Sequence, residues 1–209
     1  MRRQGGPLYL LGPSMWRRSF LSFALAGAGC AATSEFMTEL AVPRSPAPVS
    51  DRATVVFIRP SSYAVSLVVT IVDAQGHFLG DALPSSFFVS RVEPGEHTFI
   101  GWAENTSALR ASVEAGKVSF VEVDVKLGAL SPRAHLKALT PESERWAERE
   151  SWLSDAHELE VDEASGQAYL ESRSDDVEAL VRVARRTLEA YSPAELAERT
   201  LSPNDGIRP

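Results

Sequence analysis

Short strand-like runs separated by turn residues constrain this fold more than any other feature of the sequence. Between residues 53 and 139, runs rich in β-branched and aromatic residues recur about every eight to twelve residues. The clearest are TVVFIR at 54–59, SLVVTIVD at 66–73, SFFVSRV at 86–92 and VSFVEVDV at 118–125. Because no helical period interrupts the series, the sequence predicts a mainly β fold, a small antiparallel sandwich.

Turn residues between the runs mark where the chain reverses. Gly76, in VDAQGHFLG, supplies the positive φ of a tight hairpin, so the run ending at Asp73 pairs with HFLGD at 77–81. Further turns are expected at EPG, residues 93–95, and at EAGK, residues 114–117. Alternation along 118–125 places Val121, Val123 and Val125 on one face and Phe120, Glu122 and Asp124 on the other.

The aromatic residues of these runs allow two interpretations. Core packing accounts for most of them, because large apolar side chains are usually buried. Phe87 and Phe88 are neighbours in one strand and must point to opposite faces, so one of them could remain exposed. If a ligand stacks on the sandwich, Phe88 and Trp102 are the candidate ligand-facing aromatics.

From Pro132 onward the composition turns helical. Thr140 as N-cap and Pro141 at the first helical position predict a helix whose Trp146 and Trp152 dock it on the sandwich or on a second helix. A helix is also expected at 174–191, where apolar residues form a stripe at helical spacing.

Two shorter parts of this segment carry weaker signals. Ser192 and Glu195 spell the capping box of one more short helix. Residues 158–171 fit an extension of either neighbouring helix or a hairpin.

An export signal precedes the predicted sandwich. The sequence MWRRSFLSFALAGAGC, from Met15 to Cys30, has two arginines, an apolar run and small residues. Its apolar stretch of about ten residues is half the length that a membrane-spanning helix needs. Met15 is an alternative start, since GGP and LGP interrupt the preceding sequence.

The end of this leader resembles the lipobox of bacterial lipoproteins, although Gly27 stands where that family prefers leucine. Ala28 and Gly29 fit the box, and the resemblance implies that Cys30 is lipidated and becomes the first residue of the mature protein. Ala31 follows Cys30 where an inner-membrane retention aspartate would stand, which implies the outer membrane, facing the periplasm. The alternative is an ordinary secretory signal cleaved nearby.

Four motifs resemble an uncharacterised domain family of bacterial lipoproteins, related in plan to PEGA and transthyretin-like sandwiches. They are VVFIRP at 55–60, VDAQGHFLG at 72–80, VEPGEH at 92–97 and VEAGKVSFVEV at 113–123. The resemblance implies an Ig-like or transthyretin-like sandwich in the cell envelope, and it brings no catalytic residue with it.

The expected organisation has four parts. Residues 1–29 form a signal peptide, 30–52 a proline-rich tether that lifts the domain off the bilayer, 53–139 the sandwich and 140–209 a helical C-terminal tail. The single cysteine excludes an intramolecular disulfide, so burial must hold an exported domain together.

Charge and motifs restrict the function. A net charge of -7 with no basic face disfavours nucleic acid as a partner. His77, His97, His135 and His157 lack metal-ligand spacing, and the sequence contains neither a GxSxG elbow nor a glycine-rich phosphate loop. We therefore expect no cofactor, metal or enzymatic activity. The expected partners are the membrane, through Cys30, and an envelope protein or a cell-wall glycan.

Overall fold

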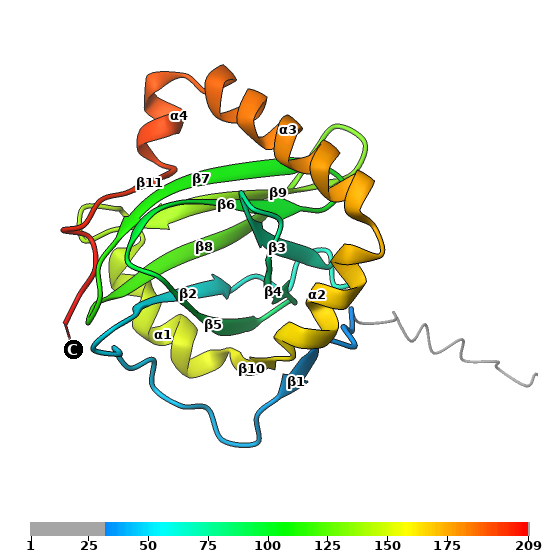
Figure 1. Cartoon of the computed structure of the whole chain (residues 1–209). Helices are drawn as coiled ribbons and strands as arrows, with labels where there is room; N and C mark the ends of the chain where they lie inside the picture. The colour runs from blue at the N-terminus through cyan, green and yellow to red at the C-terminus, as the bar shows by residue number, and fades with distance from the viewer. Residues whose placement is uncertain (1–31, 209) are drawn as a thin grey trace, which may run out of the picture.

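The computed structural model describes residues 32–208, which form two packed β-sheets and a C-terminal helical region (Figure 1). The order of the six-stranded sheet is β1-β10-β5-β2-β8-β9, and that of the five-stranded sheet is β11-β7-β6-β3-β4. The strands are β1 (Met37–Glu39), β2 (Ala53–Arg59), β3 (Val69–Asp73), β4 (Phe78–Ala82), β5 (Ser86–Val92), β6 (Gly95–Trp102), β7 (Thr106–Val113), β8 (Val118–Leu127), β9 (Pro132–Leu139), β10 (His157–Val161) and β11 (Thr200–Leu201). The helices are the 3₁₀ turn η1 (Trp146–Glu148), α1 (Arg149–Asp155), α2 (Glu163–Glu171), α3 (Ser174–Ala190) and α4 (Pro193–Ala197).

The prediction of a mainly β, sandwich-like fold is confirmed, but both sheets are mixed rather than antiparallel. Neighbours in sequence pair as antiparallel hairpins, as in β3–β4, where Gly76 has the expected positive φ of 85°. Three pairs are parallel: β2 with β8, β10 with β5, and β11 with β7. Each parallel pair joins strands far apart in the chain, so turn signals in the sequence could not reveal it.

The core lies between the sheets, and further apolar clusters cover both outer faces. All seven residues of β2 are buried, which is typical of a strand covered on both sides. The helices α2 and α3 pack on the five-stranded sheet through Leu170, Val177, Leu180, Ala184 and Leu188. Trp146, Trp152 and Leu153 cover the six-stranded sheet over Val56, Ile58, Phe87 and Phe120. The layers therefore run α1, six-stranded sheet, five-stranded sheet, then α2 and α3 (Figure 1).

The segment after residue 139 is built into both sheets instead of following them as a tail. The helix at 174–190 and the Ser192 capping box are confirmed, as is docking of the tryptophans on the sandwich. The undecided stretch 158–171 forms strand β10 and helix α2. Residues 200–201 add β11 to the other sheet.

Two expectations for residues 132–148 are corrected. PRAHLKAL, expected to turn helical, forms strand β9, because its alternating Ala134, Leu136 and Ala138 are buried against the sheet. The first helix does not begin at Thr140: hydrogen-bonded turns around Ser143 occupy its first residues, and helical structure starts at Trp146.

The N-terminal segment packs on the sandwich, where a free tether was expected. Strand β1 extends the six-stranded sheet by pairing with β10, and Met37 is buried in the core. The backbone N–H of Arg44 donates to the buried carboxylate of Glu158, so the proline-containing stretch is also attached. The prolines keep residues 41–48 out of regular structure without detaching them.

Strand β9 is the last strand of the six-stranded sheet, and groups from other elements form hydrogen bonds along its outer edge. The side chain of Asn105 donates to the carbonyl of Ala134 and accepts from its N–H, both at 2.8 Å. The hydroxyl of Ser107 accepts from the N–H of Leu136, and the carbonyl of Glu198 from that of Ala138. These contacts leave little of the edge available for pairing with another chain.

Gly166 sets the distance between α2 and β4. A Cβ atom at this position would lie 2.1 Å from the ring of Phe78. Alanine favours a helix over glycine by about 1 kcal/mol, yet we expect Gly166→Ala to destabilise the protein by about 1–3 kcal/mol because the helix must shift outward. Urea unfolding measures this, with Val183→Ala on the exposed face of α3 as control. A stabilised Gly166→Ala protein would contradict the packing of α2 on β4.

Candidate functional site

Of the three site residues predicted from the sequence, Phe88 and Trp102 do not share a site. Cys30 lies outside the described residues. Phe88 is fully buried and stacks on Phe57 with ring centroids 5.1 Å apart, so the expectation that it faces a ligand is wrong. Trp102 is half-buried on the outer face of the five-stranded sheet, with the guanidinium of Arg173 4.9 Å from its ring centroid.

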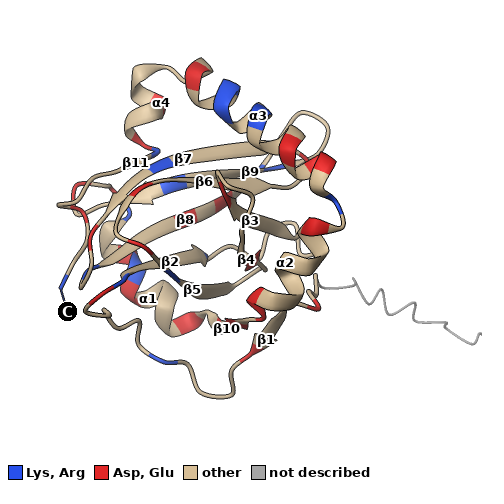
Figure 2. Ribbon diagram, in the orientation of Figure 1, with Lys and Arg blue, Asp and Glu red and all other residues tan. Residues whose placement is uncertain are grey.

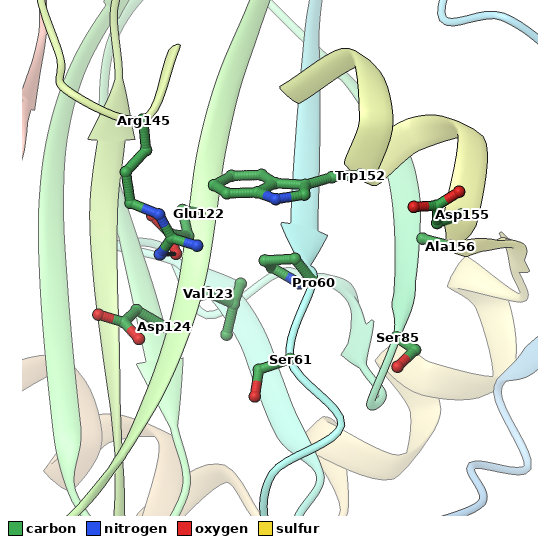
Figure 3. A pocket seen from close by; sticks show the side chains of 10 residues that line it. All are labelled: Pro60, Ser61, Ser85, Glu122, Val123, Asp124, Arg145, Trp152, Asp155 and Ala156. Carbon is green, nitrogen blue, oxygen red and sulfur yellow. Dashed lines mark hydrogen bonds and ion pairs between the residues drawn. The ribbon is translucent and has the colours of Figure 1, made fainter. Parts of the chain in front are cut away.

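A pocket of about 290 Å³ lies between α1 and the outer face of the six-stranded sheet, and Figure 3 shows the side chains that line it. Strand β8 contributes Glu122 and Asp124, and the loops after β2 and before β5 contribute Ser61 and Ser85. The opposite wall consists of Arg145, Trp152, Asp155 and Ala156. An indole ring, hydroxyls, carboxylates and a guanidinium thus share one concave surface.

Glu122 is the buried charge of this pocket. It is only 3% exposed, although it lies on the face of β8 that carries Phe120. Burial raises the pKa of Glu122, and the positive charge of Arg145 opposes that shift in part. Arg145 donates from Nη1 to Oε1 of Glu122, so the carboxylate is paired on its solvent side.

Trp152 and Glu148 hold Arg145 in place. The guanidinium carbon lies 4.4 Å from the centroid of the Trp152 ring, a cation–π geometry. Nη2 lies 3.4 Å from the carboxylate of Glu148. Figure 3 shows the Arg145 guanidinium pointing at Glu122 and the indole ring over Pro60. These contacts therefore hold the Arg145 guanidinium beside the Glu122 carboxylate without a ligand.

A second cavity, of about 360 Å³, adjoins the first. Glu122 and Arg145 line both cavities, and Lys137, Thr140, Glu142 and Glu198 are among the other residues of the second. Lys137 pairs in register with Glu122 across β8 and β9, and its ammonium lies 3.3 Å from Asp124. The Glu122–Arg145 ion pair thus lies where the two cavities meet.

Sequence reasoning placed Glu122 on the face of its strand opposite Val121, Val123 and Val125, and docked Trp152 on the sandwich or on the second helix, but it assigned neither residue to a site. The available signal was an acidic residue two positions after Phe120 on a buried face, since a carboxylate there needs a partner. Its partner, Arg145, lies in the turns preceding α1, so the pairing depends on tertiary structure.

Within residues 32–208 no helix is long and apolar enough to cross a membrane. In the same range, no group of three or more His, Cys, Asp or Glu side chains is placed to hold a metal ion. No family model, curated protein or solved structure matches this chain. The site must therefore be interpreted from its own geometry.

Replacing Glu122 tests the electrostatics of the pocket. With a pKa raised in the folded state, wild type loses stability as the pH rises above 4.5, the ordinary glutamate value, toward the folded-state pKa. A difference of one between the folded and unfolded pKa corresponds to about 1.4 kcal/mol of unfolding free energy. We expect Glu122→Gln to be less stable relative to wild type at acid pH than at neutral pH.

The measurement is urea unfolding of both proteins across this pH range. The comparison between variant and wild type cancels contributions from other buried acids such as Asp81, whose pKa is also raised by desolvation. Glu148→Gln, half-exposed and facing the same Arg145, is the control and should show a smaller effect. A pH-independent difference for Glu122→Gln would contradict the buried-carboxylate interpretation.

Proposed function

We propose that this protein is a non-enzymatic lipoprotein of the bacterial cell envelope, anchored through Cys30, whose sandwich is a structural or protein-interaction module. The observation that carries the proposal is the position of Cys30, at the end of the export signal and two residues before the folded body. All of the described fold, residues 32–208, follows Cys30 in the chain.

The form of the sandwich supports an interaction or structural role. Helices cover both sheets, and side chains or backbone from other elements occupy the β9 edge. A domain closed in this way presents fixed surfaces without needing a partner to complete its core. Function rests on these surfaces, not on the sandwich as such.

Lipidation is tested by intact mass and membrane fractionation of the full-length protein in a bacterial host. Wild type is expected in the membrane fraction with the added mass of a lipidated cysteine, and Cys30→Ala is expected to lack both. Gly27→Leu restores the residue that the lipobox prefers, so it should be processed at least as completely as wild type. Equal cleavage and solubility of wild type and Cys30→Ala would refute the anchor and leave a secreted sandwich.

The pocket between α1 and β8 favours a second candidate, a glycan or peptidoglycan-binding module. Small-molecule pockets combine an apolar lining with a few convergent polar groups, and Trp152, Glu122 and Arg145 supply both here. Ser61 and Ser85 add hydroxyls at the opposite wall. This surface replaces the Phe88 and Trp102 face expected from the sequence.

Co-sedimentation of the purified domain with cell-wall peptidoglycan tests this candidate. Trp152→Ala is expected to weaken binding about tenfold, which corresponds to ~1.4 kcal/mol. Glu122→Gln should also weaken it while leaving the apolar contacts of α1 in place, and Trp102→Ala, at the other sheet, should not. Wild-type protein that sediments no more than a charge-matched control would remove this candidate.

A further inference from the structure

One end of the sandwich exposes apolar side chains on two loops. In the 60–68 loop between β2 and β3, Tyr63 is 41% and Val65 46% exposed. In the β8–β9 turn, Leu127 is 79% exposed and Leu130 completely so. The large apolar side chains exposed elsewhere in residues 32–208 are Val42, Tyr169 and Val183.

The parallel pairing of β2 and β8 brings these two loops to the same end. Ile58 pairs in register with Glu122, so both strands point their C-terminal ends in one direction and each loop follows such an end. Figure 1 shows both loops on the right of the molecule, the β8–β9 turn above, and the C-terminus on the left. The longer β8 makes the turn at 127–131 project beyond the sheet.

Arg59 holds the 60–68 loop in a fixed shape. Its buried guanidinium donates to the carbonyls of Tyr63, Ala64, Leu67 and Ala82 at 2.6–3.1 Å. With these carbonyls turned inward, Tyr63 and Val65 are presented outward by a rigid loop. Their exposure is therefore built into the fold.

The N-terminal segment starts at this same end. The backbone N–H of Ala32 donates to the carbonyl of Val65 at 2.6 Å. Two peptide units separate Cys30 from Ala32, and each spans about 3.8 Å between Cα atoms. A lipid on Cys30 would thus be attached within about 8 Å of Ala32, beside the apolar loops.

Two exposed cations lie at the base of the apolar β8–β9 turn. Lys126 and Arg133 pair in register there, and Lys126 also forms an ion pair with Asp124 at 3.0 Å. The turn itself contains no charged residue and is tan in Figure 2. Apolar side chains at the tip and cations behind them suit the boundary between acyl chains and anionic headgroups.

We propose that this end of the sandwich is a membrane-contact surface, in which Tyr63, Val65, Leu127 and Leu130 enter the bilayer interface beside the lipid anchor. This inference rests on the proposed lipidation of Cys30. With so short a connection, the anchored protein keeps this end against the bilayer, and its opposite end projects outward.

The test uses the single cysteine of the chain. Lipidated Cys30 has no free thiol, so Leu130→Cys carries the one reactive thiol and accepts a polarity-sensitive fluorophore. The protein is produced in a bacterial host, purified in detergent and reconstituted in vesicles of phosphatidylethanolamine and phosphatidylglycerol. Val183→Cys, exposed on α3, is the matched control.

We expect the label at position 130 to emit at shorter wavelength in vesicles than the label at position 183. Lipids carrying a nitroxide near the headgroup should quench position 130 and leave position 183 unchanged. Equal emission and equal quenching at both positions would overturn the membrane contact. A shifted emission without nitroxide quenching would also overturn it, because it would place Leu130 against protein, such as a second copy of the chain.

Failure of the anchor itself has a different signature. If the wild-type protein does not float with vesicles and its Cys30 reacts with the fluorophore, Cys30 is not lipidated, and both proposals are overturned. If the protein floats and Cys30 does not react, but the label at position 130 has the emission of a water-exposed label and is not quenched, only the membrane contact is overturned.

Discussion

Burial of β2 on both faces is the constraint on which the rest of the structure depends. Every side chain of Ala53–Arg59 is buried, so one face needs the second sheet and the other needs a cover from outside the sandwich. The η1–α1 segment supplies that cover through Trp146 and Trp152. The five-stranded sheet has the same requirement, which α2 and α3 meet with an apolar stripe. The C-terminal segment is therefore part of the folding unit, because without it two apolar sheet faces would be exposed to water.

Two buried charged side chains of this layered structure have different kinds of partner. Arg59 has backbone carbonyls as partners instead of a carboxylate, and burial lowers its pKa to about 10, so the ion remains charged but costly. What it stabilises is the shape of the 60–68 loop. Glu122 instead has one charged partner, Arg145, at the boundary with solvent. Arg59 therefore fixes the shape of the 60–68 loop and the surface that this loop exposes. Glu122 instead forms a site at the solvent boundary, where a ligand could replace Arg145 as its partner.

Local patterns predicted much of this fold, and tertiary pairing decided the rest. Alternation placed Val121, Val123 and Val125 on one face, which lies in the core, and the stripe at Val177–Leu188 correctly indicated a helix. Parallel pairing of β2 with β8 leaves no local mark, because the two strands are separated by five others. The missed strand β9 has alternating burial but contains alanine and lysine, which are weak strand formers. The same holds for the site. Glu122 was correctly placed on the face opposite these valines, but its partner and the burial of Phe88 required the three-dimensional arrangement.

The ordered path of the N-terminal segment changes how an anchored form of this protein would be presented. A flexible tether would let the sandwich sample many orientations above the bilayer, and its distance would grow with tether length. Here β1 pairs with β10, Ala32 is bonded to Val65, and Arg44 is tied to Glu158. Because these contacts fix the N-terminal segment to the domain, the orientation of residue 32 determines the orientation of the whole domain. An anchor at Cys30 would consequently restrict orientation as well as location, and a partner would approach from the sides or from the end that carries the C-terminus.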